Sequence, residues 1–284
     1  MLVTGANGFV GTHLSRELED HGHKVTRSDL SVDLSIPGNA KGLVGGHDYV
    51  VHLAARYGRL LCRDEPHRAV TDNAAATTEL AAACAEHGIP VLYTSSSEVY
   101  GDHGEQTITE RSALRTPTTI YGLSKLWGEQ ALQLYLPPDM VCIVRLNMLH
   151  GPKQRAGYGC CALATFIQQA LNGETFTVHR NTSRSYLYIS DAVRALRMLI
   201  EGGHSGVFNC SNEQEYLPTE ELAEVVVAEA GGTYEVTDPP PGIQIRHKQF
   251  SSAKLRATLD WEPEVGLTEG IRRTVESQRK VSLA

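Results

Sequence analysis

The chain has 284 residues, of which 41% are hydrophobic and 21% are charged, and its formal net charge is −7. These fractions are ordinary for a soluble globular protein and exclude a disordered, coiled-coil or collagen-like chain. The acidic balance argues against nucleic acid or an anionic membrane as a partner, because either needs a basic surface.

Strand-like and helix-like segments alternate along the first half of the chain. Strands are predicted at residues 1–4, 24–28, 48–53, 90–94 and 140–146, and helices at 9–19, 69–86 and 120–135. This alternation predicts an α/β fold, a Rossmann-type doubly wound parallel sheet with helices on both faces. Few hairpin signals interrupt the pattern, so we expect no large antiparallel sheet.

The pattern loosens after residue 151. Strands are predicted at 186–189 and 207–210, a proline-rich loop at 238–242, and helices at 163–171, 192–201 and 220–230. Thr219 is a plausible N-cap for the last of these helices. We expect residues 1–151 to form the main domain, with segments near 184–212 returning to it. Residues 152–284 are expected to form mainly a smaller α/β cap that binds substrate.

Apolar runs, cysteines and histidines indicate where the protein works and whether it holds a metal. No run approaches the ~18 apolar residues of a membrane span, and the first residues lack the pattern of a signal peptide. The six cysteines are too sparse for a disulfide scaffold, so we expect a reduced, cytoplasmic protein. His21 and His23 form an H-x-H pair without a predicted third ligand, and we expect no metal site.

A glycine-rich turn follows the first predicted strand with the spacing G-x-x-G-x-x-G. Gly5 permits the tight turn, Gly8 lets the backbone approach a pyrophosphate, and Gly11 lets the next helix pack closely. The N–H groups at that helix start then face the phosphates. Asp29 suits the ribose hydroxyls of NAD and disfavours NADP, a preference that the nearby Arg27 softens. The sequence predicts an NAD-binding domain; the alternative is a glycine-rich surface turn with an unrelated Asp.

Tyr121 and Lys125 lie four residues apart on a predicted helix, and therefore on one face. A free tyrosine is a poor base, with a pKa of about 10, and an adjacent ammonium favours its phenolate. Ser96 and Glu98 follow the fourth strand, at the end where open α/β sheets bind ligands. We interpret these four residues as a candidate catalytic group. The alternative is a solvated helix face beside a serine-rich loop.

With these motifs in order, the chain resembles the extended short-chain dehydrogenase/reductase family, and within it the NAD-dependent nucleotide-sugar epimerases, dehydratases and decarboxylases. Further segments match that family over nearly the whole chain: residues 33–34, 52–55, 73–77, 145–152, 184–191 and 259–263. Ala76 stands where glycine is usual, and His150 replaces a tyrosine. The resemblance implies a set of NAD-binding residues: Gly5, Asn7, Gly8, Phe9, Val10, Gly11, Asp29, Asp33, Leu34, Leu53, Ala54, Ala55, Asn73, Tyr121 and Lys125.

The same resemblance implies transient oxidation of a nucleotide-linked hexose or hexuronate at C4. Tyr121 then takes the C4 hydroxyl proton, Ser96 hydrogen-bonds that hydroxyl, and Lys125 binds the nicotinamide ribose. Glu98 stands where dehydratases and decarboxylases carry a Glu near C5, which favours 4,6-dehydration or decarboxylation. The alternatives are a 4-epimerase, an NAD(P)H-dependent keto-sugar reductase and a non-catalytic dinucleotide-sensing protein. In a 4-epimerase Glu98 only orders its loop.

The resemblance also implies substrate contacts and a homodimer. Its substrate-binding positions are Ser97, Asn147, Arg184 and Arg246. Guanidinium groups suit a diphosphate, although either arginine can instead form a surface ion pair. The loop of Arg56, Tyr57 and Arg59 either faces the substrate or is solvated. Family dimers form through the helices predicted at 69–86 and 120–135.

Overall fold

The computed structural model describes residues 1–239 and 247–282, which form two compact units. The first unit consists of Met1–Gly101, Ala113–Leu146 and Val193–Asn209. The second contains Asp102–Ser112, Asn147–Ala192 and the described residues from Cys210 onward. In these ranges, no helix has both the length and the apolar character needed to cross a bilayer.

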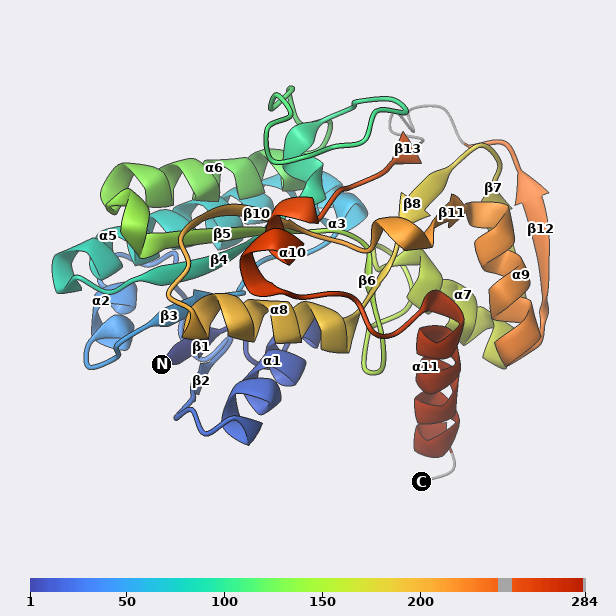
Figure 1. The fold of residues 1–284 in the computed structure, drawn as a ribbon, viewed down its shortest axis with the longest axis horizontal. Coiled ribbons are helices and arrows are strands. Elements are labelled where there is room, and N and C mark those ends of the chain that lie inside the picture. Colours follow the sequence, from blue (N-terminus) through green and yellow to red (C-terminus); the bar gives the residue numbers. More distant parts are fainter. Residues whose placement is uncertain (240–246, 283–284) are drawn as a thin grey trace. The chain divides into compact units, whose positions relative to one another are not determined.

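The first unit is built on a parallel sheet (Figure 1). In the described chain six strands lie in the order β10-β5-β4-β3-β1-β2. The pairings of β1 with β2 and β3, and of β4 with β3 and β5, are all parallel. The strands are β1 Leu2–Thr4, β2 Thr26–Ser28, β3 Val50–His52, β4 Val91–Ser96, β5 Val141–Leu146 and β10 Gly206–Cys210. The predicted Rossmann-type sheet is confirmed.

Helices cover both faces of this sheet. In Figure 1, α2, α5 and α6 lie on one face, and α1 and α8 lie on the other. The helices are α1 Phe9–Asp20, α2 Asn39–Val44, α3 Arg59–Asp64, α4 Pro66–Ala69, α5 Ala76–His87, α6 Ile120–Tyr135 and α8 Ile189–Glu201. Short 3-10 helices span Ser97–Tyr100 and Pro138–Met140. Strand order reverses between β1 and β3, so the carboxyl ends of these strands open the crevice where such sheets bind ligands.

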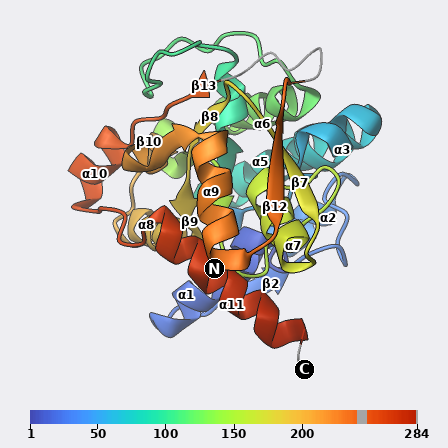
Figure 2. The same cartoon turned by 90° about the vertical axis from the view of Figure 1, so that its right-hand side faces the viewer.

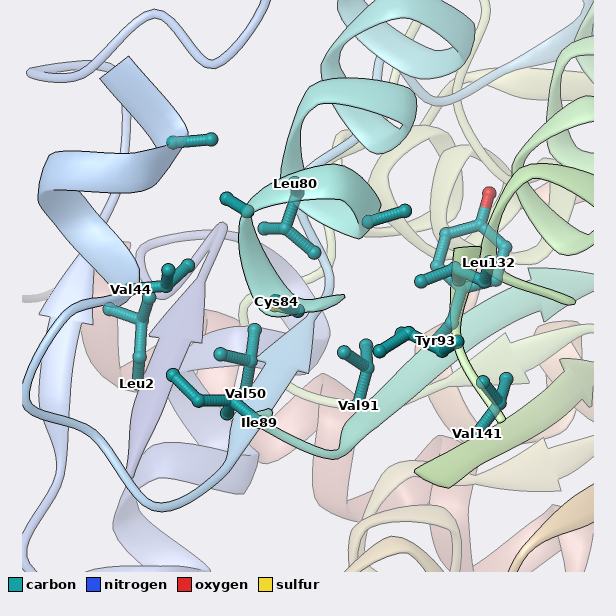
Figure 3. Packing of buried hydrophobic residues seen from close by; sticks show 14 of the residues in the cluster. Leu2, Val44, Val50, Leu80, Cys84, Ile89, Val91, Tyr93, Leu132 and Val141 are labelled. Carbon is teal, nitrogen blue, oxygen red and sulfur yellow. The ribbon is translucent and has the colours of Figure 1, made fainter. Parts of the chain in front are cut away.

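The core of this unit lies between the sheet and the helices α5 and α6 (Figure 3). Leu80 of α5 and Leu132 of α6 are fully buried against Val50 and Val91 of the sheet. Gly128 lets α6 approach β4, because a Cβ there would collide with the hydroxyl of Tyr93. A side chain at this one position would push the helix off the strand.

The single helix predicted at residues 69–86 is wrong in one respect. The chain forms α4, then a π-helix over Val70–Ala75, and then α5. A π-helix widens the turn by one residue. Here it contains the buried Asn73, whose side chain reaches the main chain of Arg56 and the hydroxyl of Ser124. Alanine-rich composition predicts helix but does not register such a local widening.

The second unit has its own core, formed by α7, α9 and α11 (Figure 2). These helices are Ala162–Leu171, Thr219–Ala230 and Leu267–Ser282. Beside them β12, Thr233–Thr237, pairs in parallel with β7, Thr175–His179. The α9 helix begins at Thr219 itself and its N-cap is Pro218, so the predicted N-cap is off by one residue.

Short strands complete this unit. β8 Ser183–Ser185 lies between β11 Tyr216–Pro218 and β13 His247–Lys248, and β6 Leu149–His150 pairs with β9 Leu187–Tyr188. A 3-10 helix spans Glu213–Glu215, and α10 spans Ala253–Leu259. The strand predicted at 186–189 is thus shorter, and Tyr186 separates it from β8. Residues 240–242 of the predicted proline-rich loop lie outside the described residues.

Candidate active site

The glycine turn after β1 has the geometry of a phosphate cradle. Gly5 has a φ of 67°, and a Cβ there would lie 2.7 Å from the main-chain nitrogen of Ala54. A Cβ on Gly11 would collide with the Gly5 carbonyl oxygen. Gly8 is the N-cap of α1 and offers no side-chain cap, and Phe9 and Val10 open the helix. The first N–H groups of α1 thus have no capping side chain, which fits a bound pyrophosphate.

The carboxylate of Asp29 lies beside this turn, after β2. One oxygen accepts a hydrogen bond from the Asn7 N–H at 2.7 Å, and the other accepts from the N–H of Leu30 at 2.9 Å. Arg27 pairs instead with Glu19 on α1, at 2.6 Å. The guanidinium that we expected to soften the preference for NAD is therefore held by another carboxylate.

Five further predicted cofactor residues come after β2 and β3. Asp33 accepts hydrogen bonds from the hydroxyl and N–H of Ser35, which lower the pKa of the Asp33 carboxyl. Leu34 is buried, and Leu53, Ala54 and Ala55 directly follow β3. The set comes from segments after β1, β2 and β3, which lie side by side. These residues fit a dinucleotide.

The predicted catalytic residues come together from β4 and α6. The hydroxyl of Thr119 caps α6 by accepting a hydrogen bond from the Gly122 N–H at 3.0 Å, and Tyr121 lies in the first turn. The Ser96 hydroxyl, at the end of β4, is hydrogen-bonded to Tyr121 and also accepts from the N–H of Glu98 at 3.2 Å. Glu98 in turn accepts from the Thr119 hydroxyl at 3.4 Å. Ser97, which lies between Ser96 and Glu98 in the sequence, is also buried.

Tyr121 is buried, and this burial dominates its acidity. Burial raises the pKa of Tyr121 above its ordinary value, the hydrogen bond with Ser96 opposes the rise, and the nearby Glu98 and Cys62 add to it. Lys125 is not among the causes of this shift, so its expected lowering of the Tyr121 pKa stays a prediction. Because a phenolate in this place lacks water, it needs a nearby positive charge.

Lys125 is buried one turn further along α6. Its Nζ lies 4.1 Å from the centroid of the Tyr93 ring, on β4. Burial lowers the pKa of Lys125 to about 7, and the Glu129 carboxylate acts in the opposite direction. The ring of His52 also stacks on the ring of Tyr93, with 5.6 Å between their centroids. Burial and the Lys125 charge lower the pKa of His52 to about 3, so this imidazole is neutral.

A hydrogen-bonded series links these residues. The ring nitrogens of His52 contact the hydroxyls of Thr4 at 2.7 Å and of Thr77 at 3.0 Å. Thr77 also shares a hydrogen bond with the hydroxyl of Tyr93, and this hydroxyl donates to the Lys125 carbonyl at 3.4 Å. The series ties β1 to α6.

Sequence reasoning missed a buried ion pair beneath α6, the helix that carries Tyr121 and Lys125. Arg145 on β5 makes a two-pronged contact with Glu129 on α6, at 2.6 Å and 2.9 Å. The Ser95 hydroxyl donates to the same carboxylate at 2.5 Å. One signal was available in the sequence. Glu129 lies one helical turn after Lys125, and so on the face that carries Tyr121.

The loop after β3 contacts the same site. Tyr57 meets the ring of Tyr121 edge-on, with 5.7 Å between centroids. The Nε of Arg59 lies 3.7 Å from a carboxylate oxygen of Glu98. Tyr57 and Arg59 thus contact candidate catalytic residues, and the orientation of this loop toward the substrate stays a prediction.

Candidate substrate residues also lie in the second unit. The buried Asn147 donates to the Ser185 carbonyl at 3.1 Å and to the Ser211 hydroxyl at 3.3 Å. Its buried Oδ1 has no hydrogen-bond partner in the described part of the chain. Arg184 donates to the Ser183 carbonyl at 2.8 Å. Arg246 lies outside the described residues.

The H-x-H pair is divided between two acidic partners. His21 lies 3.7 Å from Glu17, and His23 lies 2.9 Å from Glu201. Over residues 1–239 and 247–282, no group of three or more His, Cys, Asp or Glu side chains has the arrangement of a metal site.

Comparison with known proteins places this geometry in a family. The chain is 28% identical to UDP-glucuronic acid decarboxylase 1 of Xenopus tropicalis over 99% of its own length and 72% of that protein. It is 29% identical to UDP-glucose 4-epimerase of Mycolicibacterium smegmatis over 99% of both chains. The solved structure of MoeE5 in complex with UDP-glucuronic acid and NAD superimposes with a TM-score of 0.87 at 25% identity, covering 99% of each chain.

The family comparison covers most of the chain. A family profile described as the NAD dependent epimerase/dehydratase family matches residues 1–211, which contain the glycine turn, Ser96, Tyr121 and Lys125. The chain therefore belongs to the NAD dependent epimerase/dehydratase family and is an enzyme that uses NAD.

Proposed function

We propose that this enzyme oxidises C4 of a nucleotide-linked hexuronate and then releases C6 as carbon dioxide. The observation that carries the proposal is the placement of Glu98 beside the hydrogen-bonded Ser96 and Tyr121. The similarity to UDP-glucuronic acid decarboxylases and to a structure holding UDP-glucuronic acid supports it. In this proposal the glycine turn and the segments after β2 and β3 bind NAD, and Asn147 and Arg184 keep the role that the family resemblance implies, binding of the nucleotide diphosphate.

The first step is deprotonation of the C4 hydroxyl. Ser96 and Tyr121 hold this hydroxyl by hydrogen bonds, and the Tyr121 oxygen accepts its proton. Bound NAD supplies the hydride acceptor. Lys125 places a buried ammonium on the same helix face, where it stabilises negative charge on the phenolate.

The second step follows from the ketone at C4. A carboxylate on C5 is then a β-keto acid, and the electron pair of the C5–C6 bond moves into the C4 carbonyl as carbon dioxide leaves. The protonated Tyr121 donates a hydrogen bond to the enolate oxygen that forms. Glu98 lies on the same side of the site and directs the proton that returns to C5.

A second candidate is 4-epimerisation without loss of carbon. It is favoured by the end-to-end match with the Mycolicibacterium smegmatis UDP-glucose 4-epimerase. In that reaction Glu98 takes no proton at C5 and only orders its 3-10 turn, through the contacts with Thr119 and its own N–H.

Product mass in heavy water tests the two candidates. The protein is incubated with NAD and UDP-glucuronate or UDP-glucose, and products are separated and weighed by mass spectrometry. Loss of carbon dioxide with gain of one deuterium supports decarboxylation. An isomer of unchanged mass without deuterium supports 4-epimerisation, and loss of water supports dehydration. A Tyr121→Phe variant is expected to form none of these products, and full activity in it would contradict both candidates.

We also propose that the enzyme is a cytoplasmic homodimer. On α6 the side chains of Leu123, Trp127 and Leu134 follow one stripe and are 51%, 56% and 83% exposed. An apolar stripe of this kind on a helix is suited to a second copy of the chain. The six cysteines are all free thiols, which is consistent with a reducing compartment.

A further inference from the structure

The short segment between β3 and α4 presents two side chains to the candidate catalytic residues. The ring of Tyr57 packs edge-on against Tyr121, and the guanidinium of Arg59 pairs with Glu98. Between them Gly58 has a φ of 109°, which turns the chain sharply into α3. The loop therefore reaches both the residue proposed to act at C4 and the residue proposed to act at C5.

This segment is anchored, so the position of Arg59 is defined by its neighbours. Arg56 pairs with Glu65 at 2.5 Å and lies 3.7 Å from Asp72 on the π-helix. The thiol of Cys62, on α3, donates to the Arg56 carbonyl at 3.3 Å and is fully buried against Tyr121. Of the loop's arginines, Arg56 is thus committed to holding the segment, whereas Arg59 faces the site.

The contact with Glu98 does not use all the hydrogen-bonding capacity of Arg59, so its guanidinium can also pair with a second carboxylate. At 3.7 Å this contact is an ion pair longer than a hydrogen bond. A guanidinium carries five N–H donors in a plane and can serve two carboxylates at once. The Arg59 side chain is 38% exposed and that of Glu98 is 14% exposed, so an incoming anion can reach the arginine.

A hexuronate needs such a cation at this place. Its C6 carboxylate is bonded to C5, the carbon on which Glu98 is proposed to act. Two carboxylates a few ångströms apart repel each other strongly when water is largely excluded. A neutral C6 hydroxymethyl group of a hexose meets no such repulsion and gains little from the arginine.

We infer that Arg59 selects nucleotide-linked hexuronates over hexoses by pairing with the C6 carboxylate while it neutralises Glu98. The inference rests on the proposed function, since it assumes that C5 and C6 lie beside Glu98. Arg59 is then a specificity-determining residue. Its loss weakens binding of the uronate and leaves binding of the hexose nearly unchanged.

The test compares two ligands in matched variants. Dissociation constants for UDP-glucuronate and UDP-glucose are measured by calorimetry with NAD present, and KM and kcat are measured for each substrate that the wild type converts. Arg59→Gln is expected to raise the dissociation constant and KM for UDP-glucuronate roughly 10- to 100-fold, the range for loss of one charge-assisted contact. The dissociation constant and KM for UDP-glucose are expected to change less than about threefold. Arg63→Gln, on the same helix but paired with Asp64, is the control and leaves the constants for both ligands unchanged.

A double variant separates selection from simple structural support. In Arg59→Gln the Glu98 carboxylate no longer pairs with the Arg59 guanidinium and repels the uronate, so adding Glu98→Gln is expected to recover part of the lost affinity. A purely structural role gives no recovery and weakens both ligands equally, and that result overturns the inference.

The proposed function fails in a different way. If the wild type binds both ligands but converts neither, the reaction is wrong while the selectivity of Arg59 remains measurable by binding. If Arg59→Gln leaves the preference between the two ligands unchanged, the inference is wrong whatever the reaction.

Discussion

Lys125 is a buried amine whose protonation is coupled to folding. Its pKa falls from 10.5 to about 7 in the folded chain, because burial disfavours the charged form. Between these values the unfolded chain binds more protons, so this residue makes the free energy of unfolding rise with pH, by at most about 1.4 kcal/mol per pH unit. Urea denaturation of the NAD-free protein between pH 6.5 and 9.5 measures this slope. In Lys125→Met the slope is expected to be smaller, and equal slopes would contradict the low pKa.

Glu129 is the counter-charge in the same region. Glu129→Gln leaves Arg145 buried without a charged partner, which costs about 3 kcal/mol of unfolding free energy. It also removes the carboxylate that keeps the pKa of Lys125 from falling further. Urea denaturation and NMR titration of the lysine amine check the two effects. Glu86→Gln breaks an exposed pair with Lys41 and serves as the control, with no measurable change expected.

At the scale of elements, the N-terminus of α6 positions Tyr121. Thr119→Ala removes the cap on the Gly122 N–H and a contact to Glu98. Loss of such a cap costs about 1 kcal/mol. The helix start then frays at the turn that carries Tyr121, and kcat is expected to fall several-fold with little change in thermal stability. Thr119→Ser keeps the hydroxyl and should behave like the wild type. A Thr119→Ala enzyme with unchanged kcat would show that the cap does not position Tyr121.

The elements that the sequence predicted well are those whose signals are local. The bounds of α6 agree with the predicted 120–135, because a capping threonine precedes it and Pro137 and Pro138 follow it. The π-helix was not predictable, since its cause is the bonding of Asn73 to Arg56 and Ser124, which are distant in sequence. The candidate site shows the same difference. The glycine turn was predictable from the spacing of its glycines, whereas the ion pair of Arg59 with Glu98 was not, because it depends on a tertiary contact.

At the scale of the whole molecule, the apolar stripe on α6 predicts an assembly. Trp127→Glu places a charge in the middle of that stripe and is expected to shift the proposed homodimer toward monomer. Sedimentation velocity at micromolar concentration measures the change. Val236→Glu introduces the same charge at another exposed apolar position, on β12, and should leave the assembly intact. An unchanged sedimentation coefficient for Trp127→Glu would place any dimer interface elsewhere.

The hydrogen-bonded series from β1 to α6 connects the two sides of the candidate site through uncharged groups. The Thr4 hydroxyl accepts from the main-chain N–H of Ala54 at 3.3 Å and contacts Nδ1 of His52, whose Nε2 contacts Thr77. Thr77 shares a hydrogen bond with Tyr93, whose hydroxyl donates to the Lys125 carbonyl. Burial keeps the His52 imidazole neutral, so in either tautomer it offers one donor and one acceptor. The strand that leads into the glycine turn and the helix that carries the candidate base are thus joined by a connection that ordinary changes of pH do not break.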